Sequence, residues 1–314
     1  PAGIIYTSGA SESNNLAIKG IAQASRSTGR HMISTVLEHA SVGGTLTALQ
    51  QQGWEVDLLD IQRDGTIDLE QLGDLLRKDT ILVSVCAVDS ELGTVQPIRQ
   101  ITEILKDFPN CRLHVDATQA IGKTELVMDG VDTMSIAPHK FYGLNGSGLL
   151  LKKSSVIIEP QIHGGSSTTL YRSGTPALAL AVSIEKALQL TLTQQEERIR
   201  CVRQLNEYLK TALLHYPSVR INSPEGAVPH ILNLSVQGLK GTVFQRVLSE
   251  RGVCVSVKSA CSAEGTPSKA VFAVSGDRKN ALSSWRVSLS HLTTREELDE
   301  FLQVFDQCYK ELVP

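Results

Sequence analysis

The first half of the chain alternates short, β-branched apolar runs with segments of helical pattern. Its longest apolar run, Thr80 to Val88, has the length of a buried strand and is well below the roughly 18 residues that span a bilayer. Continuous apolar strands separated by helices indicate a mainly parallel α/β sheet covered on both faces. The strands expected from this pattern are residues 3–7, 31–35, 55–59, 81–88, 112–115, 133–136 and 148–151.

The second half follows another pattern. A long helical stretch, about residues 176–214, is rich in Ala, Leu, Gln and Glu and has the character of a connector. Shorter elements come after it, with strands expected at 230–236, 253–256 and 285–288 and a last helix near 295–310. We therefore expect a large domain over residues 1–195 and a small α+β domain over residues 196–314. Because Pro1 leads directly into a strand-like segment, the chain is also expected to lack an N-terminal segment.

Charge and cysteine usage narrow the classes of partner. The formal net charge is −3, and Lys and Arg are scattered, which argues against nucleic acid and against a membrane as partners. The six cysteines lie far apart, without a CxxC pair or His residues at zinc spacing, so no metal site is predicted. Without a secretion signal, reduced cysteines and a cytoplasmic location are expected.

Two segments near the N-terminus have features of a ligand site. The TSGASESN segment joins a strand to a helix, where Gly9 permits a tight turn and free N–H groups could hold a phosphate with help from Ser11. The simpler interpretation is a helix N-cap at Ser11 with a glutamate nearby. His39 follows a strand, and its ring could lie against an aromatic cofactor or simply precede an N-cap at Ser41.

Asp116 and Lys140 each follow an expected strand. In an open α/β sheet the carboxyl ends of the strands are where ligands bind, so Asp116 could pair with a protonated pyridine nitrogen or merely cap a helix. Lys140 could be a surface lysine in a turn. Beside a cationic ring, or partly desolvated, it would instead have a lowered pKa and act as a nucleophile toward carbonyls. The ordered set of phosphate turn, His, Asp and Lys favours a ligand site.

Two residues of the second half also have chemical potential. Cys261 lies in a loop of small polar residues, which suits a reactive thiol better than a core position. Cys86 and Cys254 lie in apolar strand patterns and are expected in the core. Arg286 lies within a strand pattern, where its guanidinium could bind a substrate carboxylate or form a structural ion pair.

Seven segments, taken in order, resemble the cysteine desulfurases, the NifS/IscS-like branch of the class V aminotransferase family of pyridoxal phosphate enzymes. They are TSGASESNNLAIKG, EHASV, VDATQAIGK, APHKFYG, YRSGTPAL, SACSAEGTPS and WRVSLS. The resemblance covers nearly the whole chain, and the number of matches makes it specific. It implies the aspartate aminotransferase-like fold (fold type I), with a mainly parallel seven-stranded sheet and a small C-terminal domain.

The resemblance also implies roles for individual residues. Lys140 would carry pyridoxal phosphate as a Schiff base, with Lys140, Cys261 and His39 as the catalytic residues. Asp116 would pair with the ring nitrogen of the cofactor, and Gln119 would contact its phenolic oxygen. Its phosphate would be held by Ala10, Ser11, His139 and Thr175. Ser90 stands at the position where the family usually has an Asn that contacts the ring. Thr175 would reach the phosphate of the other subunit of a homodimer.

On the substrate side, the resemblance implies that Arg286 binds the α-carboxylate, with Asn14 also expected to contact L-cysteine. Cys261 would take the sulfur as a persulfide and pass it to a sulfur-acceptor protein, for example in iron–sulfur cluster assembly. Three positions depart from the family: Ser90 replaces Asn, Ala137 replaces a phosphate-binding Ser, and Ser11 replaces Thr. Losing two polar contacts should weaken cofactor binding by about 1 kcal/mol each. The alternatives are a selenocysteine or cystine lyase, or a catalytically degenerate paralogue that binds a partner.

Overall fold

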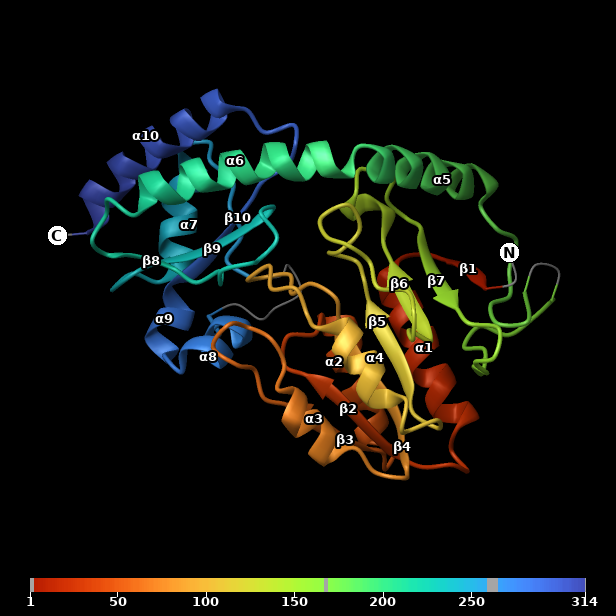
Figure 1. Ribbon diagram of the computed structural model, residues 1–314. Helices are drawn as coiled ribbons and strands as arrows, with labels where there is room; N and C mark the ends of the chain where they lie inside the picture. Colours follow the sequence, from red (N-terminus) through yellow and green to blue (C-terminus); the bar gives the residue numbers. More distant parts are fainter. Residues whose placement is uncertain (1–2, 167–168, 259–264, 314) are drawn as a thin grey trace. The chain divides into compact units, whose positions relative to one another are not determined.

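The computed structural model describes residues 3–166, 169–258 and 265–313 (Figure 1). Contacts between Cα atoms divide the chain into two compact units. The larger holds the chain up to Asp60, Ile67–Val88 and Gln96–Thr193, and the smaller holds Ile61–Thr66, Asp89–Val95 and the chain from Gln194 onward. The two short excursions differ from the single boundary expected after residue 195. Asp89–Val95 belongs to the smaller unit because Glu91 is bonded to it: the Glu91 carbonyl accepts from Asn233, and its carboxylate accepts from Ser268.

The larger unit is built on a seven-stranded sheet, as expected, and its strand order is β1-β7-β6-β5-β4-β2-β3. β2, β3, β4, β5 and β6 pair in parallel, and β7 runs antiparallel to both β1 and β6 (Figure 1). The sheet is thus mainly parallel. Its strands are β1 (Ile4–Thr7), β2 (His31–Thr35), β3 (Glu55–Leu59), β4 (Thr80–Cys86), β5 (Arg112–Asp116), β6 (Thr133–Ile136) and β7 (Gly148–Lys152).

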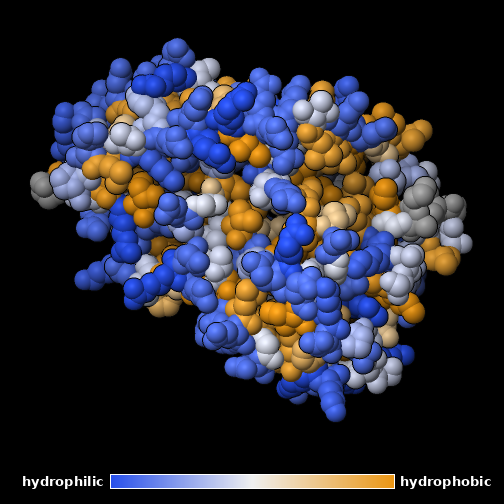
Figure 2. All heavy atoms as spheres, in the orientation of Figure 1, coloured by the Kyte–Doolittle hydropathy of each residue, from blue (hydrophilic) through white to orange (hydrophobic). Residues whose placement is uncertain are grey.

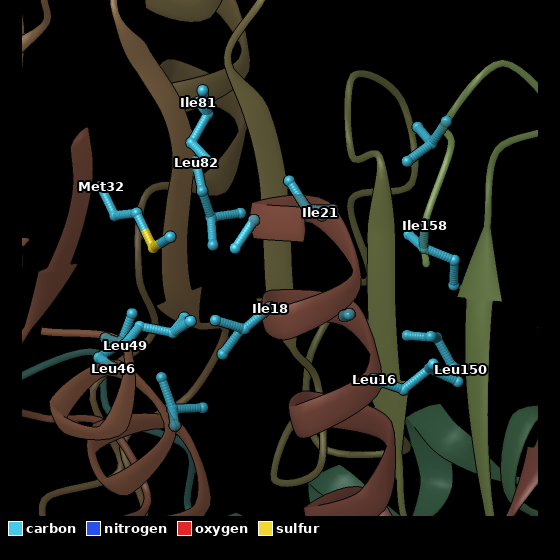
Figure 3. Close-up of a cluster of buried hydrophobic side chains, with 14 of the residues drawn as sticks. Leu16, Ile18, Ile21, Met32, Leu46, Leu49, Ile81, Leu82, Leu150 and Ile158 are labelled. Carbon is cyan, nitrogen blue, oxygen red and sulfur yellow. The ribbon is translucent and has the colours of Figure 1, made fainter. Parts of the chain in front are cut away.

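The helices of the larger unit are α1 (Ala10–Ala24), α2 (Ala40–Gln50), α3 (Leu69–Leu75), α4 (Ile98–Leu105) and α5 (Leu178–Thr193), with a 3₁₀ turn, η1, at Pro138–Lys140. α1 and α2 pack together over the sheet and enclose the main core, in which Ile18 is directed toward Leu49 and Leu16 toward Leu150 (Figure 3). Each such fully buried side chain stabilises the unit by about 1.5–3 kcal/mol. The same helix also buries two polar side chains, Ser13 and Asn14, and Asn14 reaches Asp116 of the sheet.

The smaller unit contains an antiparallel sheet of order β10-β9-β8. Its aromatic core centres on Trp285, which stacks on Phe244 with ring centroids 5.5 Å apart and lies beside Phe305. Its elements are α6 (Gln195–Leu213), β8 (Val219–Ile221), β9 (Ile231–Val236), α7 (Gly241–Glu250), α8 (Lys269–Ser275), α9 (Arg278–Ser283), β10 (Ser284–Ser288) and α10 (Arg295–Leu312).

Three expectations from the sequence are wrong. The long helical stretch is two helices, α5 and α6, because Gln194 between them leaves the helical conformation with ψ near 10°. Residues 253–256 form no strand, since only Ser256 bridges to Arg286. Cys254 is accordingly exposed, whereas Cys86 is buried as expected. Within the described part of the chain, no helix is long and apolar enough to cross a membrane.

Candidate active site

The sheet gathers four of the predicted segments at one edge. β2, β4, β5 and β6 run in one direction, and β1 shares it because both β1 and β6 are antiparallel to β7. Their carboxyl ends therefore meet at the same edge, which is the ligand-binding edge of open α/β sheets. Gly9, His39 and Lys140 follow such ends, and Asp116 is itself the last residue of β5.

The start of α1 is suited to binding an anion. Gly9 is its N-cap and offers no side chain, and the first intrahelical bond is from the Ser13 N–H to the Gly9 carbonyl at 3.1 Å. The N–H groups of Ala10 and Ser11 thus precede the intrahelical ladder and point beyond the helix end. Ser11 lies inside the first turn and is exposed, so the alternative interpretation of Ser11 as the N-cap is wrong.

Glu12, in the same turn, forms an ion pair that balances its negative charge. Glu12 accepts a hydrogen bond from the Ser8 N–H at 2.7 Å and pairs with the Arg172 Nε at 2.9 Å. Burial raises the pKa of Glu12, but the bonds from Arg172 and Ser8 outweigh it and leave that pKa below its usual range. The arginine therefore keeps the acidic side chain from opposing an anion at the helix start.

Asp116 ends β5 as a buried carboxylate with a donor on each oxygen. Oδ1 accepts from the Thr118 N–H at 3.0 Å, and Oδ2 accepts from the Asn14 Nδ2 at 2.8 Å. The carbonyl oxygen of Asn14 lies 3.0 Å from Nε2 of His114, which is on the same face of β5 two residues earlier. Burial lowers the pKa of His114 to about 4. The role of Asn14 as a substrate contact stays a prediction, while its observed bonds are to protein groups around Asp116.

His39 is the N-cap of α2, and its Nδ1 accepts from the Ser41 N–H at 3.1 Å and lies 2.8 Å from the Ser41 hydroxyl. The alternative of an N-cap at Ser41 is therefore wrong. The preceding Glu38 was not predicted to matter. One of its oxygens accepts from the Cys86 N–H and the Thr35 hydroxyl, both at 2.9 Å, and its Oε2 is buried without a hydrogen-bond partner among the described residues. Burial raises the pKa of Glu38 to about 8, so the group is mainly protonated at neutral pH.

Lys140 is the last residue of η1, directly after β6, and is exposed together with His139. Partial burial, followed by the neighbouring Lys140 charge, lowers the pKa of His139. Ala137 is buried and supplies no hydroxyl here. Gln119 uses its carbonyl oxygen to accept from the Lys123 Nζ at 2.6 Å, so its amide N–H groups are the ones that face other partners.

The remaining predicted residues belong to other segments of the chain. Thr175 is an exposed residue of the larger unit, shortly before α5. Ser90 and Arg286 belong to the smaller unit, where the Arg286 Nη1 donates to the Ser90 carbonyl at 2.6 Å. Burial lowers the pKa of Arg286. Cys261 lies outside the described residues. Among the described residues nearest to it in sequence, the Lys258 Nζ donates to the carbonyl and the hydroxyl of Thr266, both at 2.8 Å. No group of three or more metal-ligating side chains is found in the described ranges.

Comparison with known proteins places the chain in a family. The model of the aminotransferase class-V family matches residues 1–301. The NifS/IcsS protein homolog of Lactobacillus delbrueckii subsp. bulgaricus is 39% identical over 98% of this chain and 81% of its own length. The cysteine desulfurase IscS of Dictyoglomus turgidum is 35% identical over 98% of this chain and 79% of its own length. A solved NifS-like protein superposes with a TM-score of 0.93 at 32% identity, covering 99% of this chain and 84% of that one. The chain belongs to the class-V aminotransferase family, in its NifS/IscS-like cysteine desulfurase branch.

Proposed function

We propose that this chain is a pyridoxal phosphate-dependent cysteine desulfurase. L-cysteine and the Cys261 thiol yield L-alanine and a persulfide on Cys261: the carbon–sulfur bond of the substrate breaks, and a sulfur–sulfur bond forms. The observation that carries the proposal is the meeting of the Gly9 turn, His39, Asp116 and Lys140 at one carboxyl edge of the sheet. A reduced, cytoplasmic environment suits the thiol chemistry.

The chemistry of these side chains fits pyridoxal phosphate. Asp116 is a buried carboxylate that retains lone pairs beyond its two donors and can hold the proton of a pyridine nitrogen. The start of α1 supplies N–H groups for a phosphate, with His139 as a further donor. Gln119 supplies an amide N–H for the phenolic oxygen, and Lys140 supplies the amine for the aldehyde. When bound, the cofactor acts as an electron sink for the bonds at the substrate α-carbon.

The protein residues then divide the proton transfers. With the cofactor bound, the Lys140 amine would be the base that takes the α-proton of the substrate. Asp116 would hold the proton of the ring nitrogen, and His39 would lie against the ring face. Arg286 holds the substrate carboxylate, and the Cys261 thiolate attacks the substrate sulfur. The persulfide is passed to a sulfur-acceptor protein.

Two positions offer fewer contacts than the family pattern. Ala137 has no hydroxyl for the phosphate, and Ser90 uses its carbonyl to accept from Arg286. We expect the chain to bind the cofactor more weakly for this reason, by about 1 kcal/mol per lost bond.

A homodimer accounts for an apolar surface of the larger unit. Leu178, at the start of α5, is 73% exposed, and Val182, one turn later, is 57% exposed. Orange spheres gather where α5 lies (Figure 2). A patch of this kind on one helix face is typical of a protein–protein interface. Thr175 lies shortly before α5, so a second copy seated here would also lie next to Thr175.

The deciding experiment measures alanine and sulfide released from L-cysteine, in a mild reductant, by the wild type and by Cys261→Ala. We expect both products from the wild type with added cofactor, and no sulfide release by the persulfide route in the variant. Cys201→Ala, which removes a thiol of α6, is the matched control and should behave as the wild type. Equal release by Cys261→Ala refutes the persulfide step and would favour a cystine or selenocysteine lyase. A wild type that binds no cofactor would identify a degenerate paralogue.

A further inference from the structure

Polar side chains from four elements join in one hydrogen-bonded series that leads to the carboxyl edge of the sheet. The series leads from β6 through β5 and α1 to the start of α2, with Asp116 attached to its middle. Its distances are Thr133 Oγ1 to His114 Nδ1 2.9 Å, His114 Nε2 to Asn14 Oδ1 3.0 Å, Asn14 Nδ2 to Asp116 Oδ2 2.8 Å, Asn14 Nδ2 to Ser41 Oγ 2.9 Å, and Ser41 Oγ to His39 Nδ1 2.8 Å.

The protons of the first half of this series can be assigned from donor and acceptor chemistry. The carboxylate of Asp116 only accepts, so Asn14 must present its NH₂ group to it and its oxygen to His114. An oxygen at 3.0 Å requires a proton on Nε2 of His114. Because burial lowers the pKa of His114 to about 4, the ring is neutral at pH 7 and holds this single proton. Its Nδ1 then accepts from the Thr133 hydroxyl.

The same donor and acceptor reasoning gives the position of the proton on the His39 ring. The second N–H of the Asn14 amide points to the Ser41 oxygen, which is therefore an acceptor and directs its own proton elsewhere. Nδ1 of His39 lies 2.8 Å from that hydroxyl and 3.1 Å from the Ser41 backbone N–H. Two donors on one ring nitrogen leave no place for a proton on it. A neutral His39 thus carries its proton on Nε2.

We propose that Ser41 is a positioning residue that fixes His39 as its Nε2–H tautomer and, through Asn14, keeps the His39 ring at a fixed position relative to Asp116. The inference rests on the proposed function, in which His39 and Asp116 flank the cofactor ring. Asn14 and Ser41 are 27 residues apart in sequence, and Asn14 and Asp116 are 102 apart, so local structure alone does not align them. With Nδ1 occupied, a neutral His39 presents its Nε2–H as a hydrogen-bond donor.

A purely structural role is the competing explanation. Ser41 lies in the first turn of α2, and its carbonyl accepts from the Thr45 hydroxyl at 2.7 Å. If Ser41 served only the helix, Ser41→Ala would change stability without changing the tautomer of His39. Thr47 provides a matched control on the same helix, because it is exposed and its hydroxyl donates only to the Gly43 carbonyl, at 2.9 Å, among the bonds seen.

The test records two-bond ¹H–¹⁵N correlations of the histidine rings in the full chain, for the wild type, Ser41→Ala, Ser41→Thr and Thr47→Ala. A His39→Asn variant identifies the His39 signals. We expect the Nε2–H tautomer in the wild type, Ser41→Thr and Thr47→Ala. Ser41→Ala keeps the backbone N–H at Nδ1 of His39 but loses the hydroxyl donor, so we expect an Nδ1–H form to appear beside the Nε2–H form. A wild-type His39 protonated at Nδ1, or a Ser41→Ala spectrum unchanged at His39, overturns the proposal.

Kinetics of the cofactor-loaded enzyme supply the second readout. We expect Ser41→Ala to lower kcat roughly tenfold with KM for L-cysteine within about twofold, and Ser41→Thr to restore it. A kcat equal to that of the wild type contradicts the positioning role. The spectra report the His39 tautomer without any enzymatic turnover, so the role of Ser41 and the proposed desulfurase function can be refuted independently. Alanine release with a Nδ1–H ring at His39 refutes only this inference, whereas the expected tautomers without alanine release refute the proposed function.

Discussion

Gly148 lies where two segments of the site approach each other closely, and we predict that Gly148→Ala weakens both folding and cofactor binding. Gly148 starts β7 and pairs with Thr7 of β1. A Cβ on it would lie 2.5 Å from the carbonyl carbon of Gly9 and 2.6 Å from the Cα of Gly9. Carbon atoms in favourable contact are about 3.5 Å apart, so the two segments must separate by about 1 Å. Both clashing atoms are backbone, which no rotamer change can relieve.

The displacement has two measurable consequences. Overpacking of this size costs about 1–3 kcal/mol of unfolding free energy. It also moves the start of α1, and a shift of about 1 Å in a binding group is expected to weaken cofactor affinity at least tenfold. Urea unfolding and a cofactor titration followed by absorbance measure the two effects.

Gly44→Ala is the matched control for this substitution. Gly44 lies inside α2, and a Cβ there would meet no atom within 4 Å. The alanine should therefore stabilise the chain by about 0.5–1 kcal/mol and leave cofactor affinity unchanged. The reasoning is refuted if Gly148→Ala unfolds at the wild-type urea concentration and binds the cofactor with wild-type affinity.

Three further predictions concern other parts of the molecule. Burial raises the pKa of Glu38 from 4.5 to about 8, so the stability that this acid contributes is complete below pH 4.5 and is lost as the pH rises through 8, by up to about 1.4 kcal/mol per pH unit. Urea unfolding between pH 5 and 9 should thus show a flatter profile for Glu38→Gln, and equal slopes would contradict the assignment. Arg286→Lys removes the guanidinium that donates at 2.6 Å to a backbone carbonyl, and KM for L-cysteine should rise about tenfold with little change in kcat; an unchanged KM would exclude Arg286 from carboxylate binding. Leu178→Asp should give a monomer by light scattering while Leu214→Asp, at a comparably exposed position on the smaller unit, should not; a Leu178→Asp dimer would show that α5 is not the interface.

The sheet and its ligand-binding edge were predictable from the sequence. Apolar runs such as β4 are long enough and continuous enough to identify buried parallel strands, and Asp116 and Lys140 follow two such runs directly. Once the strands are known to be parallel, their carboxyl ends must share an edge. Local pattern therefore placed the main residues without any knowledge of tertiary contacts.

The hydrogen bonds around these residues were not predictable in the same way. Asn14 reads as one polar residue in a helix, and only the packing of α1 on the sheet directs it to Asp116. Ser41 and Glu38 each owe their importance to a partner on another element. A weak signal did exist for His114, which is two residues before Asp116 in a strand and so must share its face.

Two predictions for short segments were wrong, each for a local reason. Residues 253–256 have β-branched composition, yet a single bridge to Arg286 is all the pairing available to them, and Cys254 is exposed as a result. The break at Gln194 lies in a segment rich in Leu, Gln and Glu, in which only Thr191 and Thr193 weaken the helical pattern, so the backbone conformation is what reveals the division into α5 and α6. Intrinsic propensity describes such segments poorly when tertiary contacts decide them.

The central claim is that Lys140 holds the cofactor, and one measurement tests it directly. The purified chain is incubated with pyridoxal phosphate, reduced with borohydride, digested and analysed by mass spectrometry, with Lys140→Ala and Lys153→Ala treated in parallel. We predict a phosphopyridoxyl mass on the peptide containing Lys140 in the wild type and in Lys153→Ala, and none in Lys140→Ala. A stoichiometric adduct on another lysine, or an equal adduct in Lys140→Ala, would contradict the account.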